Sequence, residues 1–169
     1  MAPSLIIIAH NIRSTHNVGS LLRTAEGLGV AKLYITGYTP YPKQIKDKRL
    51  PHIAEKIHSQ IHKTALGAEE LLPWQQSDAI HEVIVKLKKD GYTIAGLEQT
   101  PESIQLPKFQ PPQKLAILLG SEVTGIDTEL LNHLDYCLEI PMSGKKESFN
   151  VVEAASMAMY HCLQVAVSS

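Results

Sequence analysis

The sequence predicts a single α/β domain over residues 1–169, with a mostly parallel sheet and helices on both faces. The chain has 169 residues, which suits one domain of ordinary size. Hydrophobic residues make up 44% of it and charged residues 20%, a balance typical of globular proteins. Short apolar runs alternate along the chain with segments of helical spacing, and this order favours parallel β-α-β units.

The first such unit lies near the N-terminus. Residues 4–10 form a continuous apolar run, typical of a central strand that is covered on both faces. Asn17 is expected to cap a helix over residues 18–26, which Gly29 helps to end. Residues 32–36 follow as a second strand, so the two strands should run parallel through a right-handed crossover.

The middle of the chain is less regular. Three prolines fall within residues 37–51, and we interpret this segment as a functional loop. A short helix is expected over residues 62–71 and a brief edge strand over residues 72–74. Asp78 should cap the next helix, over residues 79–89.

The C-terminal half contains three further strand candidates, over residues 93–98, 114–119 and 136–142. A short helix is expected before the last of them, over residues 127–134. A last helix over residues 148–167 is apolar almost all round, and a chain of this size has little room to bury it. We therefore expect a homodimer through this C-terminal helix.

Charge is distributed unevenly along the chain. The net charge is −1, whereas nucleic-acid binders are often strongly basic. Residues 32–63 nevertheless carry seven lysines and arginines against two acidic residues. This segment either meets a polyanion or is a solvated, lysine-rich linker. Its histidines, His52, His58 and His62, are expected to lie on the surface, so no metal site is predicted.

Nothing in the sequence indicates export or a membrane span. The longest unbroken apolar stretches, such as residues 5–9, are far shorter than the roughly 20 residues that cross a bilayer. A signal peptide requires basic residues before its apolar region, and none precedes residues 5–9. Cys137 and Cys162 form no C-x-x-C pair, so we expect reduced, buried thiols in a cytoplasmic protein.

The chemistry is expected in the loops that follow the strands, because ligands bind beyond the carboxyl ends of a parallel sheet. The first loop leads to Asn17, with Arg23 two turns further along the helix. The second contains Gly120 and Glu122, and the third contains Ser148. Taken singly, these residues are as well explained by helix caps, a tight turn and an exposed arginine.

Several function classes lack their motifs. No G-x-G-x-x-G follows the first strand and no G-x-x-x-x-G-K-[ST] occurs, which argues against dinucleotide and Walker-type sites. The residues around Ser121 do not form the G-x-S-x-G of a hydrolase nucleophile.

Together, the three loops resemble the motifs of the SpoU, or TrmH-like, family of SPOUT RNA 2′-O-ribose methyltransferases. Residues 17–25, 118–125 and 140–151 are similar to the family's first, second and third motifs and occur in the family's order. Residues 62–69 are also similar to a family segment. The resemblance extends over nearly the whole chain.

This resemblance implies an enzyme that transfers a methyl group from S-adenosylmethionine to a ribose 2′-hydroxyl of RNA, with tRNA favoured over rRNA. It also implies a C-terminal trefoil knot and a homodimer whose C-terminal helices pack together. No separate RNA-binding domain is predicted, so the core itself is expected to hold the RNA.

The family's roles carry over to the matching residues. By this resemblance Arg23 is the catalytic arginine, and four residues support it: Asn17, Glu122, Ser148 and Asn150. The residues expected to bind the cofactor are Leu97, Leu119, Gly120, Ile140, Met142, Ser148 and Asn150. The residues expected to bind RNA follow instead from the cluster of positive charge in the proline-bounded loop, and they are Lys43, Lys46, Lys48 and Arg49. Three tyrosines of the same segment either stack on unpaired bases or pack in the core: Tyr34, Tyr38 and Tyr41.

Two roles for Arg23 stay open. The family's arginine is often described as a base that removes the hydroxyl proton, but a guanidinium with a pKa above about 12 stays charged. A fixed positive charge beside the ribose oxygen would instead stabilise the developing alkoxide. Water or a phosphate oxygen would then take the proton.

The main alternative function is a noncatalytic RNA-binding module that retains the SPOUT fold. The five matching polar residues argue against it, because an inactive site has no chemical need for all of them. An enzyme that acts on a small nucleotide is a third hypothesis, which the missing phosphate loop disfavours.

Overall fold

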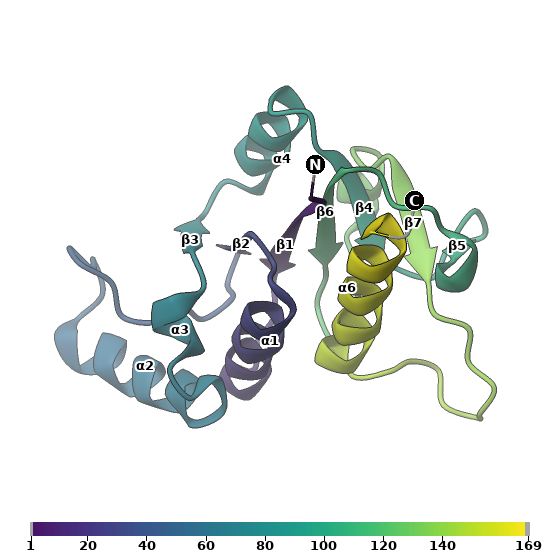
Figure 1. Cartoon of the computed structure of the whole chain (residues 1–169). Helices are drawn as coiled ribbons and strands as arrows, with labels where there is room; N and C mark the ends of the chain where they lie inside the picture. Colours follow the sequence, from purple (N-terminus) through teal and green to yellow (C-terminus); the bar gives the residue numbers. More distant parts are fainter. Residues whose placement is uncertain (1, 168–169) are drawn as a thin grey trace.

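The computed structural model describes residues 2–167 and contains one seven-stranded sheet (Figure 1). All strand pairs run parallel, in the order β3-β2-β1-β6-β4-β7-β5. The strands are β1 (Ser4–His10), β2 (Lys32–Thr36), β3 (Trp74–Ser77), β4 (Thr93–Leu97), β5 (Ile104–Gln105), β6 (Lys114–Leu119) and β7 (Tyr136–Glu139). The predicted α/β class and parallel sheet are confirmed.

The strand β1 lies in the interior of the sheet and is buried on both faces. Residues 5–10 are all buried. Ile7 belongs to one core cluster, whereas Ile6 and Ile8 belong to the cluster on the other face. β1 pairs with β2 on one side and with β6 on the other, where Ile7 lies opposite Ile117. The continuous apolar run reflects this burial on two faces.

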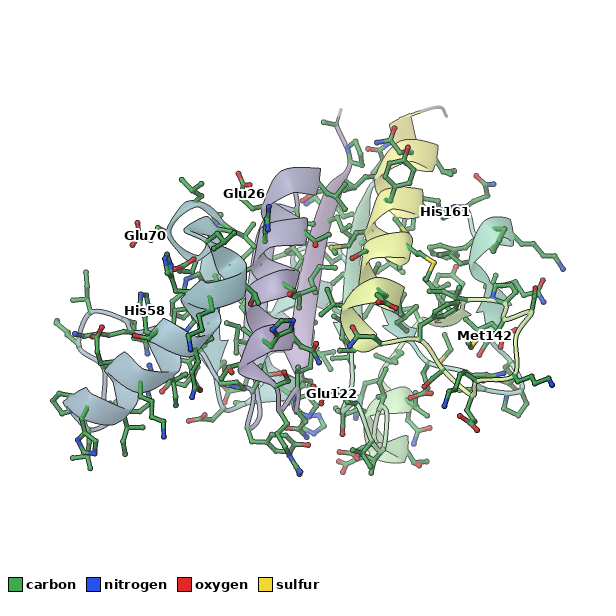
Figure 2. The ribbon with its side chains drawn as sticks, turned by 90° about the horizontal axis from the view of Figure 1, so that it is seen from below. Glu26, His58, Glu70, Glu122, Met142 and His161 are labelled. Carbon is green, nitrogen blue, oxygen red and sulfur yellow. The ribbon has the colours of Figure 1, made fainter. Side chains whose placement is uncertain are left out.

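Helices cover both faces of the sheet. They are α1 (Thr15–Leu28), α2 (Pro51–Ala65), α3 (Ala68–Leu71), α4 (Ile80–Lys89), α5 (Thr128–Leu131), α6 (Val151–Val167) and the short 3-10 helix η1 (Leu106–Lys108). α1 and α6 lie side by side on one face (Figure 2), and α2 packs against α1. α4 and α5 cover the other face, where Ile84, Leu87 and Leu130 join the second core cluster.

The helix α1 begins earlier than the sequence predicted. Ser14 is its N-cap, because the Ser14 hydroxyl accepts a hydrogen bond from the Asn17 backbone N–H at 3.1 Å. Asn17 therefore lies in the first turn, and the prediction that it caps the helix is wrong. This placement leaves the Asn17 side chain free to contact other loops. Gly29 ends the helix in the left-handed conformation, with φ 77°.

The helix α2 is the largest difference from the sequence prediction. Prolines favoured a loop through Pro51, but Pro51 occupies the first helical turn, where a missing N–H leaves no hydrogen bond unmade. The helix expected over residues 62–71 is the end of α2 followed by α3. Leu66 with φ 52° and Gly67 with φ 99° separate the two. β3 begins at Trp74, two residues later than predicted, and lies at the sheet edge as expected.

The last strand and the last helix are both shorter than predicted. β7 ends at Glu139, so residues 140–150 form one long loop before α6. Asn150, and not Ser148, caps α6, because Asn150 Oδ1 accepts a hydrogen bond from the Val152 N–H at 2.8 Å.

Two smaller predictions also differ from the structure. Asp78 does not cap α4, and the Ser77 hydroxyl instead accepts a hydrogen bond from the Ala79 N–H at 3.2 Å. The helix expected over residues 127–134 is only the four residues of α5. The proline-rich segment over residues 101–112 contains β5 and η1.

The helix α6 has two different faces. Ala155, Ala158 and Met159 are fully buried in the core of the single chain, whereas Met157 is 37% exposed and Tyr160 is 60% exposed. Part of the apolar excess seen in the sequence is therefore buried within one chain. No helix in the described part of the chain is long and apolar enough to span a membrane.

Candidate active site

A cavity opens at the carboxyl ends of β4, β6 and β7, where the loops that follow these strands converge. Its volume is about 610 Å³, which suits a small-molecule ligand. All of the residues expected to bind the cofactor line it: Leu97, Leu119, Gly120, Ile140, Met142, Ser148 and Asn150. The structure thus brings together residues from three separate segments of the sequence.

One hydrogen-bond network joins the three motif loops. The Asn17 amide nitrogen donates to Glu122 Oε1 at 3.2 Å, and the Asn150 amide nitrogen donates to Asn17 Oδ1 at 3.3 Å. The Glu122 carboxylate also accepts hydrogen bonds from the backbone N–H groups of Arg13 at 3.1 Å and Ser14 at 3.4 Å. Figure 2 shows Glu122 between the neighbouring ends of α1 and α6. Three of the five predicted catalytic residues are therefore linked directly.

The donors around Glu122 keep its carboxylate ionised. Partial burial by itself raises the pKa of this carboxyl, but hydrogen bonds from Arg13, Asn17 and Ser14 outweigh that effect and hold the pKa below its ordinary value. Glu122 is therefore only an acceptor at neutral pH. The Asn17 nitrogen must then face Glu122, which leaves the Asn17 oxygen for Asn150.

The loop after β6 folds back tightly on itself. Ser121 and Gly125 exchange backbone hydrogen bonds of 3.0 and 2.9 Å, and a Cβ on Gly120 would collide with the Gly125 backbone. Glu98, at the end of β4, fixes the other side of this loop by accepting a hydrogen bond from the Ile126 N–H at 2.8 Å. Glu98 was not among the predicted site residues. An acidic residue directly after a central strand was the signal that could have identified it.

The charged side chains that line the cavity, among the described residues, are all carboxylates. Its lining includes Glu98, Glu122, Glu139 and Glu147 and, among the described residues, no lysine or arginine. Such a wall attracts cations and disfavours a phosphate-bearing ligand. The rest of the wall combines apolar residues, such as Leu97, Ile140 and Met142, with uncharged polar residues and glycines. A small cation that also carries an apolar ring fits both parts of the wall.

Arg23 does not line this cavity within one chain. It lines a second hollow of about 520 Å³ between α1 and α2, with His16 and Lys63 among the other lining residues. Six positions separate Arg23 from Asn17, which is about 9 Å along a helix. Ser148 does line the cavity, but it makes no hydrogen bond to the network among the described residues. The structure of one chain therefore unites only part of the predicted catalytic set.

The four residues expected to bind RNA differ in accessibility. Lys46 and Lys48 are exposed and form no ion pair within the described residues. Lys43 is exposed but lies 3.1 Å from a glutamate of α2. Arg49 points inward: its side chain is only 16% exposed and forms an ion pair with Asp47. In this conformation Arg49 offers no free donor face to a phosphate.

The three tyrosines of the basic segment also differ. Tyr38 is 55% exposed, whereas Tyr34 is only 3% exposed. Tyr41 is half-buried and packs against Trp74, with ring centroids 6.5 Å apart. Of these three tyrosines, only Tyr38 is therefore exposed enough to stack on an RNA base.

The two cysteines are free thiols, Cys137 half-buried and Cys162 buried. Burial raises the pKa of both thiols, that of Cys162 to about 12. Both are therefore protonated at neutral pH and poorly reactive. No group of three or more possible metal ligands occurs within residues 2–167.

Comparison with known families agrees with this geometry. The model of the SpoU rRNA Methylase family matches residues 4–160, nearly the whole chain, and the chain therefore belongs to this family. The resemblance predicted from the three loops is confirmed.

Among individual proteins, the chain is 34% identical over 159 residues to the tRNA (guanosine(18)-2′-O)-methyltransferase of Saccharomyces cerevisiae. This match covers 92% of the chain but only 10% of the yeast protein. A Borreliella burgdorferi protein of the same description is 28% identical, with 94% of the chain and 66% of that protein covered. The chain thus spans less than two thirds of the length of these relatives.

Solved structures show the same fold. The SpoU methyltransferase AviRb from Streptomyces viridochromogenes, in complex with AdoMet, matches with a TM-score of 0.79 and 21% identity, covering 100% of this chain and 63% of that one. A structure described as giving insight into 2-OH methylation of C/U34 on tRNA matches with a TM-score of 0.80 and 18% identity, and the match covers 99% of both chains.

Proposed function

We propose that this chain transfers a methyl group from S-adenosylmethionine to a ribose 2′-hydroxyl of RNA, with tRNA favoured over rRNA. The observation that carries the proposal is the Asn17–Glu122–Asn150 network, which joins the three family motifs at the rim of one cavity. The description of the yeast relative as a tRNA methyltransferase supports the choice of RNA.

The cavity fits S-adenosylmethionine in size and in charge. Its volume lies within the range of small-molecule sites. Leu97, Ile140 and Met142 offer apolar contacts for an adenine ring, and Gly120 allows the tight fold of the loop that lines the cavity. The carboxylates of the wall match a positively charged sulfonium and ammonium. When bound, this cofactor supplies an electrophilic methyl group.

The residues of the network position the ribose. Glu122 orients the Asn17 amide, and Asn17 in turn orients Asn150 at the start of α6. Arg23 supplies a permanent positive charge, which lowers the energy of negative charge developing on the 2′-oxygen by about 3–4 kcal/mol in comparable sites. The proton leaves to water or to a phosphate oxygen.

The proposed enzyme is a homodimer that packs through the exposed strip of α6, which includes Met157 and Tyr160. Two observations support this assembly: the exposed apolar residues on α6, and the separation of Arg23 from the cavity of its own chain. Since α1 and α6 lie side by side, a partner packed on α6 also meets α1, which carries Arg23 (Figure 2).

The proposal also includes the C-terminal trefoil knot of the family. The strand order supports the knot. β7 is the last strand of the chain, yet it lies inside the sheet between β4 and β5, while the preceding strand, β6, lies between β1 and β4. The chain acts as one methyltransferase domain that contacts RNA through its own core. Its site of action is the cytoplasm, where free thiols persist.

Calorimetric titration with S-adenosylmethionine tests the cofactor, and methyl transfer to unmodified tRNA and rRNA transcripts tests the substrate. We expect binding at the cavity and faster transfer to tRNA. Gly120→Ala should abolish binding, since a Cβ there collides with the backbone, whereas Gly27→Ala has open space and should bind normally. RNA binding without any cofactor binding would instead identify a noncatalytic RNA-binding module.

A further inference from the structure

The loop between β2 and α2 has an unusual exposed tip. We call residues 41–50 the finger. Ile45, at its tip, is 93% exposed, and the neighbouring Lys46 and Lys48 are exposed as well. Figure 1 shows this loop at the end of the molecule opposite α6. The finger therefore presents an apolar side chain next to two exposed cations at this end of the protein.

A buried clamp holds the finger in shape. The Arg49 guanidinium donates to both oxygens of Asp47, at 2.9 and 2.5 Å, and to the carbonyls of Tyr41 at 2.9 Å and Pro42 at 3.1 Å. It also lies over the Tyr41 ring, 3.7 Å from the centroid. Asp47 in turn accepts the backbone N–H of Gln44 at 3.2 Å. These contacts close the turn that carries Ile45.

The base of the finger is fixed to the body of the protein. Tyr41 packs against Trp74 and the main core cluster. The Lys43 backbone N–H donates to His58 Nδ1 at 3.2 Å, which ties the finger to α2. Figure 2 shows His58 and Met142 at opposite ends of the molecule, so the finger lies far from the cofactor cavity.

The clamp explains the conformation of the loop, but it does not explain why the loop exposes apolar side chains. The backbone of Lys46 is in the left-handed conformation, with φ 59°, which residues other than glycine rarely adopt. The turn that results directs Ile45 into solvent. Three further exposed large apolar residues lie within the finger or close to it in sequence: Tyr38, Leu50 and Ile53. An ordered turn that displays apolar and cationic side chains together is organised for contact with a ligand.

The chemistry of the tip selects the ligand class. Lys46 and Lys48 are available to phosphates, because neither forms an ion pair with another described residue. Ile45 protrudes, so it suits the face of an unstacked base better than it suits a helix or peptide that needs a groove. Single-stranded loops of RNA offer both groups side by side.

We propose that the finger is a preformed wedge that places Ile45 against an unpaired base of the substrate RNA, with Lys46 and Lys48 on adjacent phosphates. This inference rests on the proposed RNA substrate. It also reassigns Arg49 from phosphate ligand to positioning residue, because Arg49 acts through the shape of the loop.

Replacement of Ile45 tests the wedge without altering charge. The probes are a stem–loop RNA with unpaired loop nucleotides and a fully paired duplex of the same length. Wild-type protein should prefer the stem–loop, and Ile45→Ser should lose about fivefold to tenfold in stem–loop affinity while its duplex affinity and salt dependence stay unchanged. Val85→Ser, at an apolar α4 residue that is 52% exposed, is the matched control and should retain the preference.

Replacement of Asp47 separates shape from charge. Asp47→Asn removes one negative charge, so a purely electrostatic patch would bind RNA more tightly, whereas a wedge that needs the clamp binds the stem–loop more weakly. Glu55→Gln removes the same charge beside Lys43 without touching the clamp, and it should not weaken binding. Equal tightening by both variants, or an Ile45→Ser variant with wild-type preference, would overturn the wedge.

Titration with S-adenosylmethionine on the same variants keeps the two proposals apart. Because the finger lies far from the cavity, all finger variants should bind the cofactor as the wild type does. Normal cofactor binding and methyl transfer with no effect of finger variants would reject the wedge alone. Absence of cofactor binding in every protein, including the wild type, would reject the proposed enzyme and leave the stem–loop comparison to decide on the wedge.

Discussion

Glu122 connects the loop after β6 to the β1–α1 loop and to α1, since it accepts hydrogen bonds from Arg13, Ser14 and Asn17. Glu122→Gln should reduce methyl transfer at least about tenfold and lower the free energy of unfolding by about 1–2 kcal/mol. The amide nitrogen that replaces one carboxylate oxygen cannot accept a hydrogen bond, so the β1–α1 loop loses part of its anchor. Steady-state kinetics and urea unfolding measure the two effects.

The pKa of Glu122 gives this prediction a pH dependence. Its folded-state pKa lies below the ordinary value, so its contribution to stability is present at neutral pH and is lost as the pH falls through the folded-state pKa. The difference in unfolding free energy between wild type and Glu122→Gln should therefore be full at pH 7 and shrink in acid. A difference that stays constant down to pH 3 would show that the carboxylate charge is unimportant.

Substitution of Arg23 separates methyl transfer from cofactor binding. It lies outside the cavity of its own chain, so Arg23→Ala should bind S-adenosylmethionine nearly as the wild type does but lose methyl transfer by about 100-fold or more. Arg23→Lys should fail as well, because a compact ammonium does not reproduce the guanidinium geometry. A fully active Arg23→Ala protein would remove this residue from the mechanism.

At the scale of elements, the two faces of α6 should respond differently to the same substitution. Met159 is fully buried, so Met159→Asp should destabilise the fold by about 4 kcal/mol or more. Tyr160 is exposed, so Tyr160→Asp should leave the thermal unfolding of the chain largely intact but weaken the homodimer at least about tenfold. Thermal melts and sedimentation distinguish the two. A monomeric wild type at micromolar concentration would contradict the proposed dimer.

Strands were easier to predict than helix boundaries. The run from Ser4 to His10 is unambiguous because burial on two faces excludes polar residues. α2 was missed in large part because proline in a first helical turn and proline in a loop give the same local signal. The cap of α1 was misplaced because Ser14 and Asn17 are both good capping residues, and only the hydrogen bond distinguishes them.

At the scale of the whole molecule, the sequence indicated which loops form the site but not how they join. Parallel strands placed the loops at one edge of the sheet, and the family resemblance then singled out Asn17, Glu122 and Asn150 within them. The contribution of Glu98 depends on a contact between distant loops, which spacing alone does not encode. The inward turn of Arg49 is likewise a tertiary effect, since a lysine-rich sequence favours solvent exposure.

The whole molecule also separates two charge environments. The finger at one end carries exposed lysines, whereas the cavity toward the other end is lined by carboxylates, although the net charge of the chain is only −1. RNA and a cationic cofactor can therefore be held by one small domain without competing for the same surface.

Transfer of labelled methyl groups from S-adenosylmethionine to an unmodified tRNA transcript, followed by alkaline hydrolysis, tests the central claim most directly. Alkaline cleavage needs a free 2′-hydroxyl, so a ribose methylated at that oxygen survives in an uncleaved dinucleotide. The proposed reaction predicts that the label appears in alkali-resistant dinucleotides with the wild type and disappears with Arg23→Ala. Label in mononucleotides, which marks methylation of a base, or no transfer to any RNA by a protein that binds the cofactor, would contradict the account.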